Sequence, residues 1–204
     1  MQEKITHLFC DLGGVLLSNG WDRFARARAT ELFQLEGREV EERHKLYFHT
    51  YEIGKLTSDE YLSNVIFYKE RNFSKESFLD FMCAQTTAHA EMISLVRSLK
   101  STYNLTMATI NNEGRELNQF RIQHFGLKDI FHFFISSSIV HLSKPDAEIF
   151  TLALDIAQVA PANALYMDDR IQFVNIAKSF GFHGIHHTDH DSTVKAFAGL
   201  GLVL

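Results

Sequence analysis

Short apolar runs, rich in β-branched and aromatic residues, recur along the chain. Five of them have the length of buried strands: 5–10, 104–110, 131–137, 164–167 and 183–187. Helical patterns lie between the later runs, as in 146–158, where apolar residues recur at helical spacing and Lys144-Pro145 indicates a helix start. Gly126 and Gly181 stand where two further helices would end in a left-handed residue. This alternation predicts an α/β fold with a parallel sheet covered by helices on both faces.

Residues 18–88 interrupt the alternation, because they show amphipathic helical patterns and no convincing strand. Thr57 and Glu60 fit a capping box, and Ser74 is a second candidate helix cap. We therefore expect an inserted, all-helical cap of three or four helices over 18–88. Residues 1–17 and 89–204 would form the sheet domain, with hinges near 18–20 and 87–89.

Composition narrows the possible functions. The chain has 204 residues, 46% of them hydrophobic, and a formal net charge of −5 without Lys or Arg runs, so we expect no nucleic-acid partner. No run of 18 apolar residues could span a membrane, and the first residues lack the apolar region of a signal peptide. Two cysteines are too few for a disulfide framework, which favours a cytoplasmic location. The sequence does not indicate an oligomeric state.

Polar residues end several of the apolar runs. Asp11 ends the first, Asn111-Asn112 the second and Asp168-Asp169 the fourth, while Lys144 precedes a predicted helix. In an open parallel sheet, ligands bind at the carboxyl ends of the strands, so these residues should lie close together. Three carboxylates and one ammonium suit Mg²⁺ together with an anionic substrate.

The order of these groups resembles the haloacid dehalogenase (HAD) superfamily of hydrolases over essentially the whole chain. Its four motifs match Asp11-Leu12-Gly13-Gly14-Val15, Asn111, Lys144 in SKPDAEIF and Asp168-Asp169 in LYMDDR. The helical insert is similar to the small (C1) cap of the subgroup that contains epoxide hydrolase N-terminal phosphatase domains and sugar-phosphate phosphatases. The resemblance implies a Rossmann-like core and a hydrolase.

The resemblance also implies roles for the matched residues. Asp11 would attack phosphorus to form an aspartyl-phosphate, and Lys144 would neutralise charge on Asp11 and on the phosphate. Mg²⁺ would be held by a set comprising Asp11, Gly13, Asp168 and Asp169. The phosphate would be bound by a set comprising Leu12, Gly13, Asn111, Asn112 and Lys144, with glycines after the nucleophile letting backbone N–H groups approach it. We therefore expect a Mg²⁺-dependent phosphatase acting on a small phosphorylated metabolite such as a sugar phosphate.

Two positions depart from the family pattern. Gly13 replaces the second acidic residue of the first motif, which protonates the leaving alcohol in most family phosphatases, and Asn111 replaces a hydroxyl. Members that resemble α-glucose-1-phosphate phosphatases share this glycine, and an anomeric oxygen leaves with less acid assistance. Gly13 leaves two alternatives open: a catalytically silent phosphate-binding protein and, less favoured, a 2-haloacid dehalogenase. The acidic pair and the absence of a dehalogenase-type Tyr argue against the dehalogenase.

Other conspicuous residues have simpler explanations. The histidine-rich stretch 181–192 lacks regular metal-ligand spacing, and it reads as a last strand followed by a helix capped by Asp191 or Ser192. Cys10 reads as a small core residue. Trp21, Arg23 and Tyr51 lie near the predicted hinges or a cap loop, where they are candidates for substrate contact.

Overall fold

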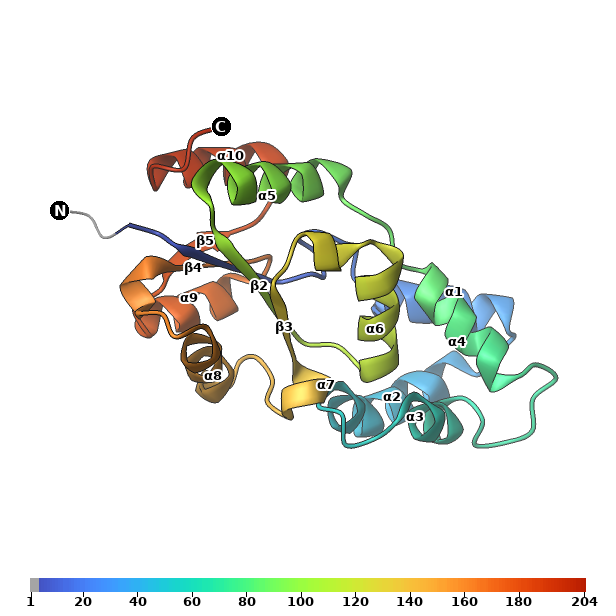
Figure 1. Cartoon of the computed structure of the whole chain (residues 1–204). Coiled ribbons are helices and arrows are strands. Elements are labelled where there is room, and N and C mark those ends of the chain that lie inside the picture. The colour runs from blue at the N-terminus through green and yellow to red at the C-terminus, as the bar shows by residue number, and fades with distance from the viewer. Residues whose placement is uncertain (1–3) are drawn as a thin grey trace.

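The computed structural model describes residues 4–204 and contains a five-stranded parallel sheet in the order β3-β2-β1-β4-β5 (Figure 1). The strands are β1 (His7–Cys10), β2 (Thr106–Asn111), β3 (Phe133–Ser136), β4 (Ala164–Asp168) and β5 (His183–His186). Each lies within a predicted run, extended by one residue in β2 and β4, so the predicted α/β, Rossmann-like sheet is confirmed. Cys10 pairs with Thr109 of β2 and with Met167 of β4, which brings the carboxyl ends of three strands side by side.

The two faces of the sheet carry alternate residues of each strand, as a strand period of two requires. Leu8 and Cys10 pack in one apolar cluster with residues of α5 (Ala90–Tyr103) and α10 (His190–Gly199). Phe9 packs in another with residues of α8 (Ala147–Ala157) and α9 (Ile171–Ser179). Figure 1 shows these helix pairs on opposite sides of the sheet. Both faces are therefore buried, which explains the nearly continuous apolar runs.

The remaining elements connect the strands. They are α6 (Arg115–His124), the 3₁₀ turn η1 (Leu127–Asp129), the short helix α7 (Ser137–Val140) and the 3₁₀ turn η2 (Pro161–Asn163). Within residues 4–204, every helix falls short of the length and hydrophobicity that a bilayer-spanning segment needs.

Helix ends confirm part of the sequence analysis and correct part of it. Gly126 and Gly181, with φ of 59° and 92°, follow α6 and α9 in the left-handed region as predicted. The proline start was wrong, because α8 begins at Ala147 with Asp146 as its N-cap. The predicted cap of α10 was also wrong: Asp189 caps it by accepting from the backbone N–H of Ser192 at 2.8 Å. That bond takes Asp191 and Ser192 into the first turn.

Four helices follow β1 and lie beside the sheet (Figure 1): α1 (Arg23–Leu32), α2 (Gly37–Glu52), α3 (Ser58–Val65) and α4 (Lys75–Ala84). The capping box of Thr57 and Glu60 is present, and Ser74 caps α4. These helices enclose their own apolar cluster, which includes Phe78. We refer to α1–α4 as the cap. Its exact boundaries at residues 18 and 88 stay a prediction.

The chain enters and leaves the cap through two adjacent segments. Ser18 donates its backbone N–H to Thr87 at 2.8 Å, and His89 donates to Leu16 at 2.8 Å. Arg121 of α6, which is 2% exposed, reaches both segments: it donates to the carbonyl of Ser18 at 2.8 Å and to the hydroxyl of Thr86 at 3.3 Å. One buried guanidinium therefore ties both connections to the sheet unit.

Candidate active site

A cavity of about 730 Å³ lies where the carboxyl ends of the strands meet the cap. From the sheet side it is lined by Asp11, Gly13, Asn111, Asn112, Glu113, Arg121, Lys144, Pro145, Asp169, Arg170 and Phe173. From the cap side and its entering segment it is lined by Asn19, Gly20, Trp21, Asp22, Arg23, Phe24, Arg26, Phe48 and Glu52. The strand-end residues singled out in the sequence thus share one cavity, apart from Leu12, whose side chain is in the core, and Asp168, which is fully buried.

Asp11 follows β1 directly and is fixed in place by its main chain, whose N–H donates to Met167 of β4 at 2.9 Å. Its Oδ1 lies 2.9 Å from the ammonium Nζ of Lys144. Burial raises the pKa of Asp11 to about 7; the Lys144 ammonium acts in the opposite direction, and Asp168 adds to the rise. A buried carboxylate of this kind needs nearby positive charge to stay ionised.

Lys144 supplies that charge and is 4% exposed. Its Nζ also lies 2.8 Å from Oδ2 of Asp168. Burial acts to lower the pKa of Lys144, but Asp11 and Asp168 outweigh burial, so the net pKa lies above its ordinary value. The ammonium is thereby held in its charged form between two carboxylates.

Asn112 positions Lys144 through the main chain. The Asn112 side-chain amide donates to the carbonyl of Lys144 at 2.8 Å, and its Oδ1 accepts from the N–H of Lys144 at 2.9 Å. Both polar groups of this side chain therefore contact the Lys144 backbone. Asn112 therefore holds the lysine loop in register, and since it also lines the cavity, its predicted contact with the phosphate stays a prediction.

The acidic pair at the end of β4 divides into two environments. Asp168 is fully buried, and it accepts from Tyr166 Oη, from Lys144 Nζ and from the N–H of Arg170. Asp169 faces the cavity and lies against Gly14, whose φ is +74° and where an added Cβ would collide with the Asp169 carboxylate. Position 14 therefore needs a glycine for two reasons: a positive φ is accessible to it, and it has no Cβ to collide with Asp169.

The donor set fits a hard divalent cation. Carboxylate oxygens of Asp11, Asp168 and Asp169 lie within 4.8 Å of one another, and carboxylates are the ligands that Mg²⁺ selects. Burial, followed by the neighbouring Asp168, raises the pKa of Asp169, which shows how strongly these negative charges crowd one another. Asp168 already accepts from three donors, whereas Asp11 and Asp169 line the cavity, where a cation could reach them.

The backbone after Asp11 offers N–H groups to an anion. Among residues 4–204, no backbone carbonyl accepts from the N–H of Leu12 or Gly13. The carbonyl of Leu12 instead accepts from Val15, Leu16 and Leu17, which turns the chain sharply. Two successive N–H groups without a backbone acceptor are the kind of donors that can bind an anion.

Asn111 is engaged in a buried side-chain network. Its amide donates to Asn118 at 3.1 Å, and its Oδ1 accepts from Ser136 at 3.0 Å. One amide hydrogen remains for a ligand, because an amide carries two. Asn111 can therefore still donate to a phosphoryl oxygen, although its position is set by the network.

The structure shows what surrounds Gly13, the position of the missing acidic residue. A Cβ at Gly13 would lie 2.7 Å from Oδ1 of Asn19 and 3.8 Å from Nη1 of Arg121. The space of the missing acidic side chain is thus filled by an amide and bordered by a guanidinium. Sequence reasoning missed Asn19, Arg121, Glu113 and Glu52, because none of them belongs to a strand-end motif.

The remaining candidates from the sequence fall into residues that line the cavity and residues that do not. Trp21 and Arg23 line the cavity, whereas Tyr51 does not; its ring packs against Gly114, where a Cβ would collide with it. Cys10 is a buried core residue, as predicted, and burial raises the pKa of its thiol. Across residues 4–204, the side chains close enough to share a metal ion are the three carboxylates, and the 181–192 histidines are not among them.

The family follows from a match between residues 5–181 and the model of the haloacid dehalogenase-like hydrolases. That match covers most of the chain, so this protein belongs to the haloacid dehalogenase-like hydrolase family. The resemblance seen in the four motifs is confirmed.

One curated relative is a phosphatase. The chain is 29% identical over 104 residues to the sesquiterpene phosphatase astK of Aspergillus oryzae, a match to 51% of this chain and 53% of that protein. It thus spans about half the length of this curated relative.

Solved structures share the fold. The HAD family enzyme bt-2542 of Bacteroides thetaiotaomicron, at 19% identity, gives a TM-score of 0.79 and covers 91% of this chain and 95% of its own. Its complex with magnesium and inorganic phosphate gives 0.75 at 20% identity over 90% and 94%. A HAD-like family hydrolase from Porphyromonas gingivalis gives 0.79 at 18% identity over 97% and 98%.

Proposed function

We propose that this chain is a Mg²⁺-dependent phosphatase that hydrolyses a small phosphorylated metabolite through an aspartyl-phosphate. The observation that carries the proposal is the arrangement of Asp11 and Asp169, which line one cavity, with Lys144 Nζ 2.9 Å from Asp11 and the buried Asp168 carboxylate clustered beside them. The named phosphatase relative and the related enzyme crystallised with magnesium and phosphate support it.

The chain's own residues supply most of the chemistry. The Asp11 carboxylate attacks phosphorus, the bond from phosphorus to the ester oxygen breaks, and water then hydrolyses the aspartyl-phosphate. Lys144 offsets negative charge on Asp11 and on the phosphoryl group, and the N–H groups of Leu12 and Gly13 hold its oxygens. Mg²⁺, held by Asp11, Asp169 and the Gly13 carbonyl, would neutralise further charge on the phosphate. The helical cap, which we assign to the small C1 type, would exclude water.

The cavity limits the substrate to a small molecule. Its volume of about 730 Å³ lies in the range of metabolite sites. A sugar phosphate is our first candidate, since Arg23, Glu52 and Asn19 offer polar contacts on the cap side. An apolar phosphate ester such as an isoprenoid phosphate is the second, favoured by the aromatic lining of Trp21, Phe24 and Phe48 and by the sesquiterpene phosphatase relative.

Turnover of p-nitrophenyl phosphate tests the proposal. We expect Mg²⁺-dependent release of p-nitrophenol that EDTA abolishes and added Mg²⁺ restores. Asp11→Asn removes the nucleophile and should lower kcat by about 10⁴-fold or more. Phosphate binding without turnover in the wild type would support a silent phosphate-binding protein instead. Halide release from 2-chloropropionate, without phosphatase activity, would support the dehalogenase.

A further inference from the structure

Five carboxyl groups line the cavity, and Gly13 leaves open which of them could serve as the acid. They are Asp11, Asp22, Glu52, Glu113 and Asp169. Asp11 and Asp169 belong to the nucleophile and cation site. Asp22 caps α1 by accepting from the N–H groups of Phe24 and Ala25 at 2.9 and 2.8 Å. Two carboxyls, Glu52 and Glu113, remain.

Glu113 is committed to an ion pair. Its Oε2 lies 2.5 Å from Nη1 of Arg121, whose planar guanidinium suits a buried ion pair with a carboxylate. Burial raises the pKa of Glu113, but this contact opposes the rise. The net pKa of Glu113 still lies above its ordinary value, but the ion pair holds its carboxylate against Arg121, so it is less free than Glu52 to approach a substrate oxygen.

Glu52 differs, because no ion pair to it forms within residues 4–204. The Asn112 amide reaches its Oε2 at 3.5 Å. Burial raises the pKa of Glu52, an effect that Lys144 and Arg170 oppose and Asp11 reinforces. Glu113 is the other charged neighbour. Glu52 is therefore a half-buried carboxyl that lines the same cavity as Asp11, and its pKa lies above the ordinary value of a glutamic acid.

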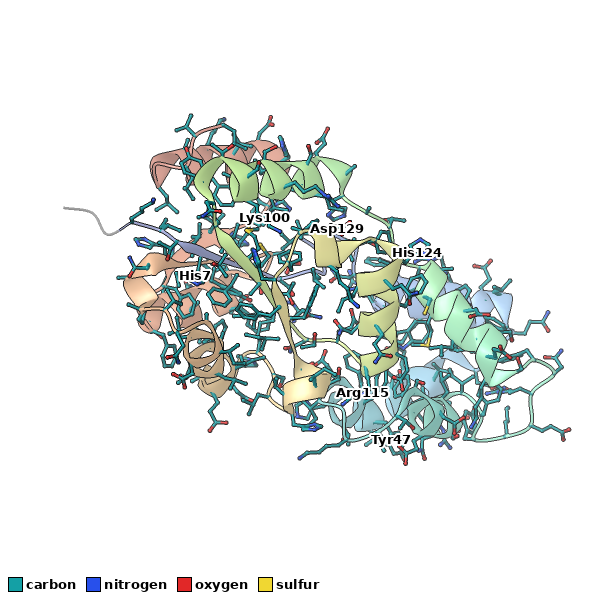
Figure 2. All side chains as sticks on the ribbon, viewed as in Figure 1. His7, Tyr47, Lys100, Arg115, His124 and Asp129 are labelled. Atoms are coloured by element: carbon teal, nitrogen blue, oxygen red, sulfur yellow. The ribbon has the colours of Figure 1, made fainter. Side chains whose placement is uncertain are left out.

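The main chain around Glu52 is fixed to the sheet unit. Its carbonyl accepts from Ser137 Oγ at 2.6 Å, and the next carbonyl, of Ile53, accepts from His141 Nδ1 at 2.7 Å. Gly54 lies so close to the Ser138 carbonyl that a Cβ would collide with it. Figure 1 shows the end of α2 against α7, where these bonds form. Arg115, labelled in Figure 2 beside α7, donates to the same Ser138 carbonyl at 3.0 Å.

We propose that Glu52 is the general acid and base of the reaction, supplied by the cap in place of the acidic residue missing at position 13. When Asp11 attacks and the bond from phosphorus to the ester oxygen breaks, the electron pair goes to that oxygen, which takes the proton of Glu52. The resulting Glu52 carboxylate then accepts a proton from the water that attacks the aspartyl-phosphate. Phosphate leaves, the Asp11 carboxylate is regenerated, and Glu52 is again protonated.

This proposal rests on the proposed phosphatase function, and Glu52→Gln tests it. Glutamine keeps the size of neutral Glu52 but cannot exchange the proton. Rapid-mixing kinetics with phenyl phosphate and p-nitrophenyl phosphate separate the two steps, since phenol is the poorer leaving group. We expect the first step to slow by about 10²-fold or more with phenyl phosphate and by less than about tenfold with p-nitrophenyl phosphate. Because the base is also lost, p-nitrophenol should appear as a burst of one equivalent followed by slow turnover.

Three variants complete the experiment. Glu42→Gln, an exposed position on the same helix, should behave as the wild type. Glu52→Ala should reproduce the selective loss if Glu52→Gln is poorly folded, as judged by its urea midpoint. Equal losses on both esters, no loss, or a selective loss in Glu113→Gln in place of Glu52→Gln would each overturn the assignment. A wild type without Mg²⁺-dependent hydrolysis of either ester would instead refute the phosphatase function itself.

Discussion

The two walls of the cavity are built in different ways. The sheet wall consists of groups that follow strands directly, and they contact one another: Lys144 lies within 3 Å of both Asp11 and Asp168. The cap wall rests on an aromatic cluster in which Phe78 packs against Trp21 and Phe33, with ring centroids 5.7 and 4.9 Å apart. Charge pairing thus fixes one wall and apolar packing the other. The chemistry should depend steeply on the charge pairs, and the stability of the cap should depend on the aromatic packing.

Removing the central charge of the sheet wall should have the largest effect. Lys144→Met leaves the buried Asp11 and Asp168 without their cation, so the free energy of unfolding should fall by about 3–5 kcal/mol. We expect kcat to fall by about 10³-fold, since a preorganised positive charge on the phosphoryl group is lost. Urea unfolding and steady-state kinetics measure the two losses. Lys195→Met, an exposed lysine on α10, is the matched control, and a loss of equal size there would refute the special role of Lys144.

Removing a buried aromatic ring from the cap and, separately, from the core of the sheet should show whether the two units unfold independently. Phe78→Ala in the cap and Phe150→Ala behind the sheet each remove a fully buried ring, at a cost of about 3–5 kcal/mol. Hydrogen exchange should show that Phe78→Ala lowers protection in α1–α4 and leaves the strands protected. Phe150→Ala should lower protection in the strands as well. Equal loss of protection everywhere in both variants would mean that cap and sheet unfold as one unit.

Acid should weaken the cap specifically. His44 of α2 has its pKa lowered to about 4, chiefly by burial and also by Arg26, and its Nδ1 lies 2.7 Å from the hydroxyl of Tyr61. Tyr61 already accepts from Trp21, so its own proton goes to a neutral His44. In the unfolded chain the pKa of His44 is near 6.5, so the unfolded chain binds the proton before the folded protein does. The stability that neutral His44 contributes is therefore complete above pH 6.5 and is lost as the pH falls toward 4.

Protonation of His44 should lower the free energy of unfolding by about 3 kcal/mol in total. Urea midpoints at pH 7.5, 6 and 5 measure it. In His44→Gln the midpoint should vary less with pH than in the wild type, and in His49→Gln, an exposed histidine of the same helix, it should vary as in the wild type. Parallel curves for all three proteins would show that His44 is not the titrating group.

The sheet wall could be predicted from the sequence because strand-end residues meet wherever parallel strands are neighbours. Asp11, Lys144 and Asp169 needed only the strand order to come together. The cap wall could not be predicted in this way. The position of Glu52 depends on where α2 ends and on hydrogen bonds to Ser137 and His141, about 85 residues later in the chain. Helical periodicity shows which face of α2 is apolar, but it does not show what its last residue will meet.

Side-chain networks were also beyond the sequence. The sequence predicts that Asn112 contacts the phosphate, and it does not show that the Asn112 amide also contacts the backbone of a residue 32 positions later. An asparagine can contact either a phosphate or a backbone segment, since its amide both donates and accepts hydrogen bonds. The filling of the space at Gly13 by Asn19 is set by the turn after β1, which no periodic pattern describes.

The attachment of the α2 terminus to α7 gives cap movement a chemical meaning. Any motion that lifts α2 from the sheet unit breaks the bonds from Ser137 and His141 and withdraws Glu52 along with the helix. The nucleophile and its lysine stay behind, because they belong to the sheet. A molecule with an open cap could then still bind a phosphate ester, but cleavage would occur only after the cap had closed. A bulky ester that keeps the cap open would therefore bind and dissociate without being cleaved.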